Sequence, residues 1–114
     1  MADTDCLFCK IVAGDIPAER VHEDDQVIVF RDINPRAPTH VLAIPRRHVA
    51  SVAYLDESDG DLLAALFLAL RRVATDHGLH GYRIVTNVGP EAGQSVFHLH
   101  FHLLGGRPLS WPPG

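Results

Sequence analysis

The stretch 94-QSVFHLHFHLLGGRP-108 decides the fold, because histidines and apolar residues alternate along its middle part. Strict alternation predicts a half-buried β-strand, here over residues 98–104, whose successive side chains point to opposite faces of a sheet. One face carries Leu99, Phe101 and Leu103 and turns to the core, and the other carries His98, His100 and His102. The strand therefore sets three imidazoles in a row on one face.

Outward from this strand, the chain consists of short patterned segments separated by single prolines and glycines, where turns belong. We expect a short helix over 7–13 that stops at Gly14, and one long helix over 59–77. Further strands are expected at 20–22, 26–30, 40–45 and 82–88, with an acidic turn at 23–25, a loop at 31–40 and a glycine-bearing loop at 89–95.

The long helix is predicted by apolar residues that recur at steps of three and four, from Leu62 to Ala74. Ser58 is expected to cap its start, with Asp61 three residues on, and Gly78 to end it in a left-handed conformation. Such a helix covers one face of a sheet. The sequence thus predicts a single α+β domain over residues 1–114, with an antiparallel sheet.

Composition excludes some classes of function. The net charge of −4 lacks the basic face that nucleic-acid binding needs. No segment approaches the eighteen or so apolar residues of a membrane span, and the first residues do not resemble a signal peptide. We therefore expect a cytoplasmic protein with neither nucleic-acid nor membrane partners.

The spacing of the three histidines favours distinct roles over one shared metal ion. Two residues along a strand advance by roughly 6.5 to 6.8 Å, so His98 and His102 lie about 13 Å apart at their Cα atoms. Imidazole titrates near neutral pH, with a reference pKa of about 6.5, so one ring can be a neutral nucleophile while others donate protons to an anion. Such a row suits phosphate chemistry. The alternatives are an ordinary polar face, or a zinc hydrolase in which His98 and His100 hold the metal.

Two cysteines, Cys6 and Cys9, stand in C-x-x-C spacing. They are too close in the sequence for a disulfide between them to stabilise the fold. They are therefore either half of a tetrahedral zinc site, completed by histidines, or a redox pair. The redox interpretation is weaker, because this C-x-x-C does not follow a strand as it does in thioredoxin-like units.

Taken together, these segments resemble the histidine triad superfamily, and within it the Hint branch of purine nucleoside phosphoramidases. The resemblance runs through "CLFCKIVAGDIPAERVHEDDQVIVFRDINPRAPTHVLAIPRRH", "YRIVTNVGPEAGQSVFHLHFHLLGGRP" and the terminal "WPPG". It implies the HIT-like fold, with about five antiparallel strands, one long helix and a short N-terminal helix.

The resemblance also implies a reaction at the α-phosphate of a purine nucleoside phosphoramidate or aminoacyl-adenylate. His100 would be the nucleophile that forms a nucleotidyl-histidine, His102 would contact the phosphate oxygens or the leaving-group side, and His40 would orient the triad. A dinucleoside polyphosphate hydrolase and a nucleotide-binding adaptor without turnover are the alternatives within the same family.

The nucleotide is expected to occupy a pocket built from both halves of the chain. By resemblance, Asp32 accepts from the ribose hydroxyls, Asn87 lies on the phosphate side, and Phe8, Phe30 and Ile33 form the walls around the base. In the loop before the triad, Gly93 would allow the backbone to approach the phosphate, while Gln94 and Ser95 offer uncharged donors.

The resemblance completes the metal site and suggests a partner. It implies a structural zinc ion held by Cys6, Cys9, His48 and His98. It also implies a homodimer, which the expected free edge of strand 82–88, the off-stripe residues Leu63, Leu68 and Leu79, and the terminal Trp111 support.

Overall fold

The computed structural model describes residues 5–114 and confirms the predicted α+β fold. Residues 1–4 of the expected domain lie outside the described part. The elements follow in this order: α1 (Leu7–Ala13), β1 (Arg20–Glu23), β2 (Val27–Arg31), β3 (Thr39–Pro45), the 3-10 turns η1 (Val52–Tyr54) and η2 (Glu57–Asp59), α2 (Gly60–Asp76), β4 (Tyr82–Val85), the 3-10 turn η3 (Pro90–Ala92) and β5 (Phe101–Gly105).

The five strands form one antiparallel sheet in the order β1-β2-β3-β5-β4. The central strand β3 places Leu42 opposite His102 and His40 opposite Leu104. Strands from the two halves of the sequence therefore meet at β3 and β5, and they bring the first half's His40 beside the triad.

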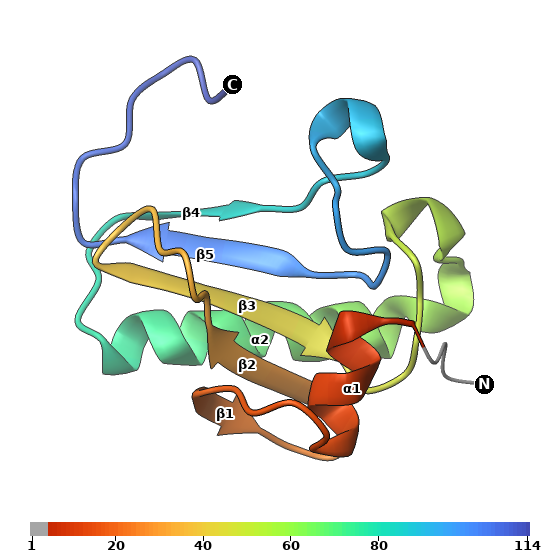
Figure 1. The fold of residues 1–114 in the computed structure, drawn as a ribbon. Coiled ribbons are helices and arrows are strands. Elements are labelled where there is room, and N and C mark those ends of the chain that lie inside the picture. Colours follow the sequence, from red (N-terminus) through yellow and green to blue (C-terminus); the bar gives the residue numbers. More distant parts are fainter. Residues whose placement is uncertain (1–4) are drawn as a thin grey trace.

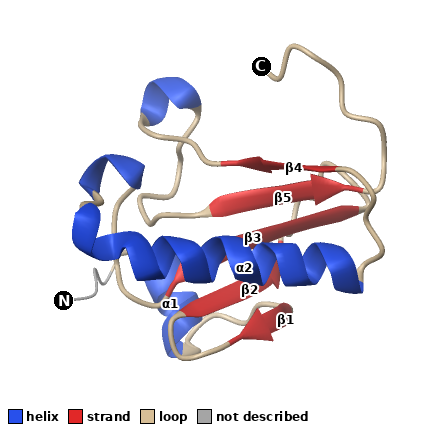
Figure 2. Ribbon diagram, turned by 180° about the vertical axis from the view of Figure 1, so that it is seen from behind, coloured by secondary structure: helices blue, strands red, loops and turns tan. Residues whose placement is uncertain are grey.

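The two helices cover opposite faces of the sheet, as Figures 1 and 2 show together. In β2, Val27 and Val29 belong to the core under α2, while Ile28 and Phe30 belong to a second core cluster that includes α1. Both faces of β2 and β3 are thus buried, which explains why their sequences are apolar at consecutive positions.

Helix α2 begins differently from the prediction. Its N-cap is Asp59, and a 3-10 turn precedes it, with a capping box between Asp56 and Asp59. The Ser58 hydroxyl donates to the Asp56 carboxylate, so the prediction that Ser58 caps the long helix was wrong. At the other end Gly78 has φ +67, the left-handed conformation that was predicted.

Strand β5 is shorter at its start than the alternation predicts. The ladder begins at Phe101, and His98 and His100 lie just before it. Backbone groups of residues 99 and 100 have partners outside the ladder. The Leu99 N–H donates to the Val49 carbonyl at 2.6 Å, and the Thr86 hydroxyl donates to the His100 carbonyl at 2.7 Å. The alternation survives, because Leu99, Phe101 and Leu103 all lie in the core under α2.

Two of the three leucines that lie outside the main apolar face of the long helix are covered within the chain itself. Leu63 and Leu79 are partly buried and pack against the core, whereas Leu68 is 59% exposed on α2. Over residues 5–114, the structure contains no helix with the length and apolar character that crossing a membrane requires.

Candidate functional site

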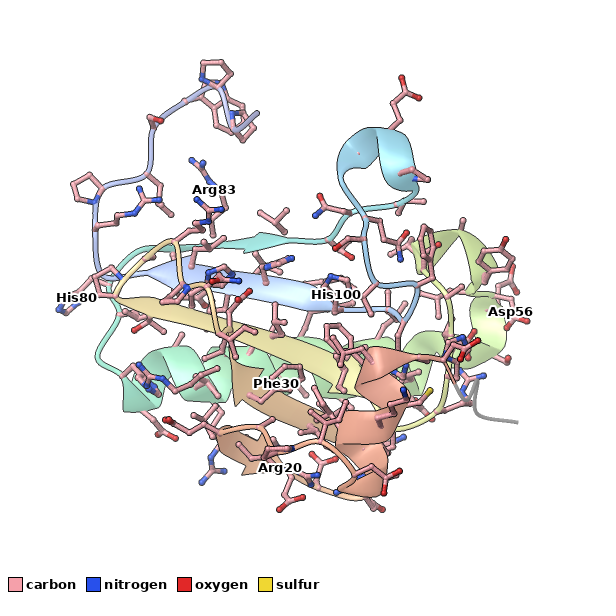
Figure 3. All side chains as sticks on the ribbon, in the orientation of Figure 1. Arg20, Phe30, Asp56, His80, Arg83 and His100 are labelled. Atoms are coloured by element: carbon pink, nitrogen blue, oxygen red, sulfur yellow. The ribbon has the colours of Figure 1, made fainter. Side chains whose placement is uncertain are left out.

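His100 and His102 of the triad line a pocket of about 360 Å³ on the α1 side of the sheet. Figure 3 shows His100 and Phe30 on neighbouring parts of this face, with α1 beside them. The pocket has an apolar body and a polar end. Its lining residues are Leu7, Phe8, Ile11, Ile16, Pro17, Ala18, Phe30, Arg31, Asp32, Ile33, Asn34, Leu42, Ser95, Val96, His100 and His102.

His100 is held in one tautomer by its own backbone neighbour. Its Nδ1 lies 2.7 Å from the His98 carbonyl oxygen, which can only accept, so Nδ1 carries the proton. Nε2 of the neutral ring then has a lone pair. The ring is 7% exposed and packs edge-on against Phe8, with 5.1 Å between ring centroids. These contacts aim an unprotonated nitrogen rather than leaving the ring free to flip.

His102, His40 and Asp32 form a connected series. The Arg36 N–H donates to His40 Nδ1 at 2.9 Å, so neutral His40 carries its proton on Nε2. That Nε2 lies 2.9 Å from His102 Nδ1 and 3.4 Å from the Asp32 carboxylate. Since His40 Nε2 carries the proton, it donates to His102 Nδ1, and neutral His102 therefore carries its own proton on Nε2. The series therefore gives a donor beside the lone pair of His100.

The protein interior keeps these rings neutral. Burial lowers the pKa of His102 to about 4, with smaller contributions from His100 and His40. Burial also lowers the pKa of His100. The pKa of His40 is lowered by burial as well, although the Asp32 carboxylate acts in the opposite direction. At neutral pH the triad is thus a set of neutral imidazoles whose tautomers are fixed by hydrogen bonds.

The loop before the triad differs from its expected role at one residue. Gln94 is buried, its Nε2 donates to the carbonyls of Ala50 and Val96, and its Oε1 accepts from the Gly89 N–H. Its amide is committed to bracing the loop, so it does not offer a donor to the pocket. Ser95 lines the pocket, while Gly93 adopts φ +93 at the end of η3.

The other predicted nucleotide residues divide into three groups. Phe8 and Phe30 are buried and pack edge-on, with 5.5 Å between ring centroids. Ile33 lines the same pocket but is 92% exposed, so it is a rim residue and not a core residue. Asn87 follows β4, is half-buried and is not among the residues that line this pocket.

Four side chains of residue types that can ligate a metal gather at the N-terminal end of α1: Cys6, Cys9, His48 and His98. Cys6 Sγ lies 3.3 Å from His98 Nδ1, and Cys9 Sγ lies 3.2 Å from His48 Nδ1 and 3.5 Å from His98 Nδ1. Tetrahedral zinc with ordinary bond lengths sets sulfur and nitrogen ligands about 3.6 Å apart. The described cluster is consistent with a zinc site.

The second shell supports metal binding by the same atoms. His98 Nε2 lies 2.8 Å from the Pro45 carbonyl oxygen, so the proton is on Nε2 and the Nδ1 lone pair points toward the sulfurs. Burial lowers the pKa of His98 to about 4, which keeps that lone pair available. Cys6 and Cys9 are thiols and not a disulfide.

A second cluster, Asp32 with His40 and His102, also has its ligand atoms close together. Its hydrogen bonds argue against a metal, because His40 Nδ1 already accepts the Arg36 N–H and Nε2 must then keep its proton. A zinc hydrolase through His98 and His100 is not supported either, because the described metal-ligand clusters place His98 with Cys6, Cys9 and His48 and do not include His100. These groups are arranged for hydrogen bonding.

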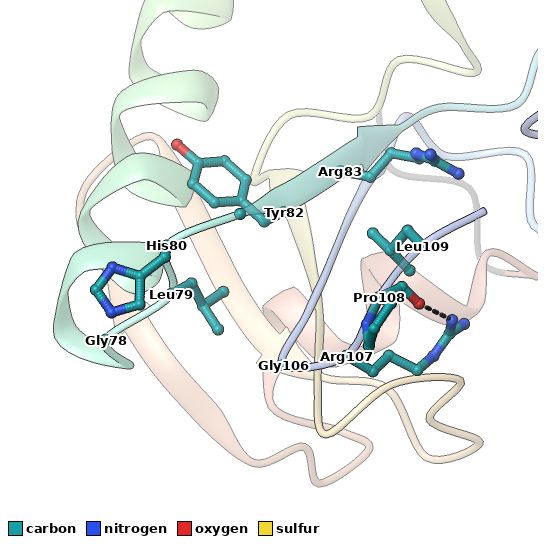
Figure 4. Close-up of a pocket in the computed structure, with 10 residues that line it drawn as sticks. Gly78, Leu79, His80, Tyr82, Arg83, Gly106, Arg107, Pro108 and Leu109 are labelled. Carbon is teal, nitrogen blue, oxygen red and sulfur yellow. Dashed lines mark hydrogen bonds between the residues drawn. The ribbon is translucent and has the colours of Figure 1, made fainter. Parts of the chain in front are cut away.

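A larger hollow, of about 510 Å³, lies at the other end of the sheet (Figure 4). It is formed between the segment after α2 and the segment after β5, and it includes His80, Arg83 and Arg107. Arg107 is engaged with the carbonyl oxygens of Arg36 and Pro108. None of the triad residues lines this hollow, whereas His100 and His102 line the smaller pocket.

Sequence reasoning missed the backbone groups that fix the triad. The carbonyls of Pro45 and His98 and the N–H of Arg36 set three tautomers, and the Thr86 hydroxyl holds the His100 carbonyl. No side-chain pattern reveals a backbone acceptor. Among these groups only the Thr86 hydroxyl belongs to a side chain, so Thr86, next to the end of a strand, is the one that its residue type could have revealed.

Comparisons with known proteins agree on one family. A family described as "Scavenger mRNA decapping enzyme C-term binding" matches residues 5–108. The chain is 48% identical over 111 residues to an uncharacterized HIT-like protein of Synechococcus elongatus, which covers 96% of this chain and 97% of that protein. It is 46% identical over 115 residues to the 14 kDa zinc-binding protein of Zea mays, covering 98% and 90% of the two chains.

Solved structures give the same result. A HIT family hydrolase from Legionella pneumophila has a TM-score of 0.95 and 49% identity, covering 96% of this chain and all of that chain (100%). A HIT family hydrolase from Clostridium thermocellum has a TM-score of 0.93 and 46% identity, covering 96% of each chain.

The fold and the site define a protein in which His100, just before β5, and His102, on β5, face a pocket with apolar walls. The matches extend over nearly the whole chain and include the triad itself. The chain belongs to the histidine triad (HIT) family, and its Cys6-x-x-Cys9 pair and His48 are consistent with a zinc-binding variant of it.

Proposed function

We propose that this protein is a purine nucleoside phosphoramidase of the Hint branch, which cleaves the bond between the α-phosphorus and an amine. Adenosine 5'-phosphoramidate and aminoacyl-adenylates are the proposed substrates. The observation that carries the proposal is His100: its Nδ1 donates to the His98 carbonyl, and the pKa of the ring is lowered by burial. The Nε2 lone pair is therefore ready for attack.

In the proposed first step, His100 Nε2 attacks the α-phosphorus, an N–P bond to the imidazole forms, and the P–N bond to the amine breaks. The amine leaves with the electron pair of that bond and takes up a proton. Water then attacks the nucleotidyl-histidine, breaks the bond to Nε2 and releases the nucleoside monophosphate. Dividing the reaction in this way replaces one difficult displacement by two easier ones.

His102 is assigned to the phosphate. The series from the Arg36 N–H through His40 leaves a proton on His102 Nε2, and the ring centroids of His100 and His102 are 5.2 Å apart. A donor at this place can stabilise the charge that develops on a phosphate oxygen. His40 then acts through His102, as a residue that sets its tautomer.

The remaining residues suit a nucleoside. Asp32 lies at the polar part of the pocket and would accept from the ribose hydroxyls, while Phe8, Phe30 and the rim residue Ile33 offer apolar surface to the base. Ser95 would donate to the phosphate or the leaving group. Few polar side chains line the base end, which fits recognition of a purine by its flat faces.

The decisive experiment compares the turnover of adenosine 5'-phosphoramidate and a diadenosine polyphosphate by the wild type and by His100→Ala. We expect faster turnover of the phosphoramidate and a loss of at least about 10³-fold in the variant, because the nucleophile is gone. A rapid quench with radiolabelled substrate should trap the nucleotidyl-protein in the wild type only.

Other outcomes identify other functions. Preference for the diadenosine polyphosphate would favour a dinucleoside polyphosphate hydrolase. Tight binding of AMP without turnover of either substrate would favour a nucleotide-binding adaptor. Unchanged turnover in His100→Ala would contradict the mechanism itself.

We also propose that Cys6, Cys9, His48 and His98 bind a structural zinc ion. Zinc in a closed Cys₂His₂ site stabilises the fold and does not activate water. Here it would join α1 to the segment before β5. Metal analysis of protein purified without a chelator should find about one zinc per chain, and a value near zero would contradict the assignment.

A homodimer is part of the proposal, as are a single domain over residues 1–114 and a cytoplasmic location. Support for the dimer comes from exposed apolar side chains on α2 and from Trp111 beside the edge strand β4. Phe67 and Leu68 on α2 are 44% and 59% exposed, and Trp111 is 80% exposed although Arg83 lies over its ring at 5.7 Å.

A further inference from the structure

One residue belongs both to the metal-binding cluster and to the support of the nucleophile. The His98 ring faces Cys6 and Cys9, and the His98 carbonyl accepts the Nδ1 proton of His100 at 2.7 Å. The side chain of this residue is thus one ligand of the proposed metal, and its backbone fixes the tautomer of the catalytic ring.

The position of that carbonyl is not set by the sheet. The β5 ladder starts at Phe101, so no strand pairing holds His98. A nearby backbone contact is the bond from the Leu99 N–H to the Val49 carbonyl, and Val49 directly follows His48. Two members of the cluster, His48 and His98, therefore flank the hydrogen bond that anchors the segment.

The position of the His98 ring depends on whether a metal ion occupies the cluster. Its Nδ1 lies 3.3 and 3.5 Å from two cysteine sulfurs, which are weak hydrogen-bond partners as thiols. A metal ion would replace these weak contacts with bonds to all four side chains. Phe8 makes a second connection, because it stands between Cys6 and Cys9 in α1 and packs edge-on against both His98 and His100.

We propose that His98 is a positioning residue for the nucleophile: metal binding at Cys6, Cys9, His48 and His98 fixes the His98 carbonyl, and this fixes the orientation and tautomer of His100. The proposal rests on the proposed function for the role of His100. It makes the metal centre a determinant of turnover as well as of stability, although the metal touches no substrate.

The direct test observes the His100 ring by long-range ¹H–¹⁵N NMR on histidine-labelled protein, which distinguishes Nδ1–H from Nε2–H tautomers. With zinc bound, we expect a single Nδ1–H form of His100. In the metal-free protein, and in the double variant Cys6→Ser with Cys9→Ser, we expect a tautomer mixture or exchange broadening, while the dispersed amide spectrum shows a folded chain.

Kinetics supply the second readout. Metal loss should lower kcat for the phosphoramidate by about 10- to 100-fold, because small displacements of a reacting group are costly. The Kd for AMP should change much less than kcat, since Phe30, Asp32 and Ile33 lie outside the cluster and only the Phe8 wall lies beside it. The matched control is Val12→Ala, which loosens the packing of α1 and leaves every ligand in place. It should keep both kcat and the His100 tautomer.

A second variant covers the case in which the metal-free chain unfolds. His48→Gln removes the one half-buried ligand and should weaken zinc binding enough for titration of folded protein. kcat and the His100 signals should then rise together with zinc occupancy. Signals and kcat that stay constant while zinc binding saturates would overturn the proposal.

The two proposals fail in different ways. If fully loaded wild type turns over no phosphoramidate but His100 still changes tautomer with zinc, the phosphoramidase proposal is wrong and the positioning role stands. If turnover is present and the His100 ring does not respond to zinc, the positioning role is wrong and the phosphoramidase proposal stands.

Discussion

His102 shows how the fold changes the behaviour of a single residue. Its ring lies half-buried between His40 and His100, and its pKa falls from the ordinary value of 6.5 to about 4. Between these two values the unfolded chain binds a proton that the folded chain does not. The contribution of His102 to the free energy of unfolding is therefore fully present above pH 6.5 and is lost as the pH falls toward 4.

This difference predicts a measurable pH dependence of stability. His102 should contribute about 2 to 3 kcal/mol to the loss between pH 6.5 and 4, allowing for its partial exposure. Urea unfolding of His102→Gln should show a correspondingly shallower slope against pH. The exposed His80 is the control, and His80→Gln should keep the wild-type slope. Equal slopes in all three proteins would contradict the prediction.

Asp32 offers a prediction about the nucleotide. Asp32→Asn keeps the size of the side chain but removes the charge, and hydrogen bonds to charged groups are worth about 1 kcal/mol more than neutral ones. The Kd for AMP, measured by calorimetry, should rise by roughly 5- to 10-fold. The matched ligand is 2',3'-dideoxy-AMP, which lacks both ribose hydroxyls. Its Kd should be the same for both proteins, and a parallel loss would show that Asp32 does not bind the ribose.

At the residue scale, the sequence predicted which face of the sheet each side chain points to, but not which nitrogen of each histidine carries the proton. Alternation alone places Leu99 in the core and His100 on the opposite face, because it requires only a period of two. The proton on His100 depends on a carbonyl brought into range by a bend before the strand. Gln94 illustrates the same limit, since its type suggested a phosphate donor while its partners are backbone groups of the loop.

At the scale of elements, the helix ends depend on backbone conformation that only some residues tolerate. Gly14 caps α1 with φ +82, and its N–H bonds to the last turn. Gly60 opens α2 in the ordinary right-handed conformation. An added Cβ would meet nothing within 4 Å at either position. The two glycines therefore differ in backbone angle and not in crowding.

This contrast predicts opposite effects of one substitution. Gly14→Ala should lower the free energy of unfolding by about 1 kcal/mol, because the left-handed conformation is costly for a residue with a Cβ. Gly60→Ala should raise it by roughly 0.4 to 1 kcal/mol, since the unfolded chain loses freedom. Both are read from urea denaturation, and a loss of stability in Gly60→Ala would contradict the explanation.

Element boundaries were harder to predict than element types. Both helices and all five strands were predicted from hydrophobic periodicity and from the positions of glycine and proline. The N-cap of α2, however, was predicted as Ser58 and is Asp59. The segment from Asp56 to Asp59 offers several capping side chains, and the choice among them depends on an extra 3-10 turn. Strand β5 lost its first three residues because tertiary partners took their backbone groups.

At the scale of the whole molecule, exposed apolar surface on α2 and an unpaired edge at β4 suggest an assembly. Light scattering at micromolar concentration should give about twice the chain mass of 12.5 kDa. Leu68→Glu should shift the protein toward the monomer, because it places a charge on that surface. Tyr54→Glu, a charge at an exposed aromatic outside α2 and β4, should leave the mass unchanged. A monomeric wild type would contradict the proposed dimer.

The order of the strands is a property that the sequence pattern alone did not specify. Periodicity predicts strands but not that β5 inserts between β3 and β4. That insertion brings Leu42 beside His102 and unites the two halves of the pocket. The resemblance to a family placed His40 near the triad in advance, but it gave no strand order.

The distance along the chain between Cys6 and His98 has a consequence for biosynthesis. Their side chains meet although 92 positions separate them. A ribosome releases the two cysteines first and His98 only after the long stretch between them has been made. During translation the nascent protein can present at most three of the four proposed ligands, so the proposed zinc site can be completed only after synthesis has passed His98. Until then Cys6 and Cys9 lack the side chain of His98 as a partner, so binding of the proposed zinc ion by all four side chains would be a late event in maturation.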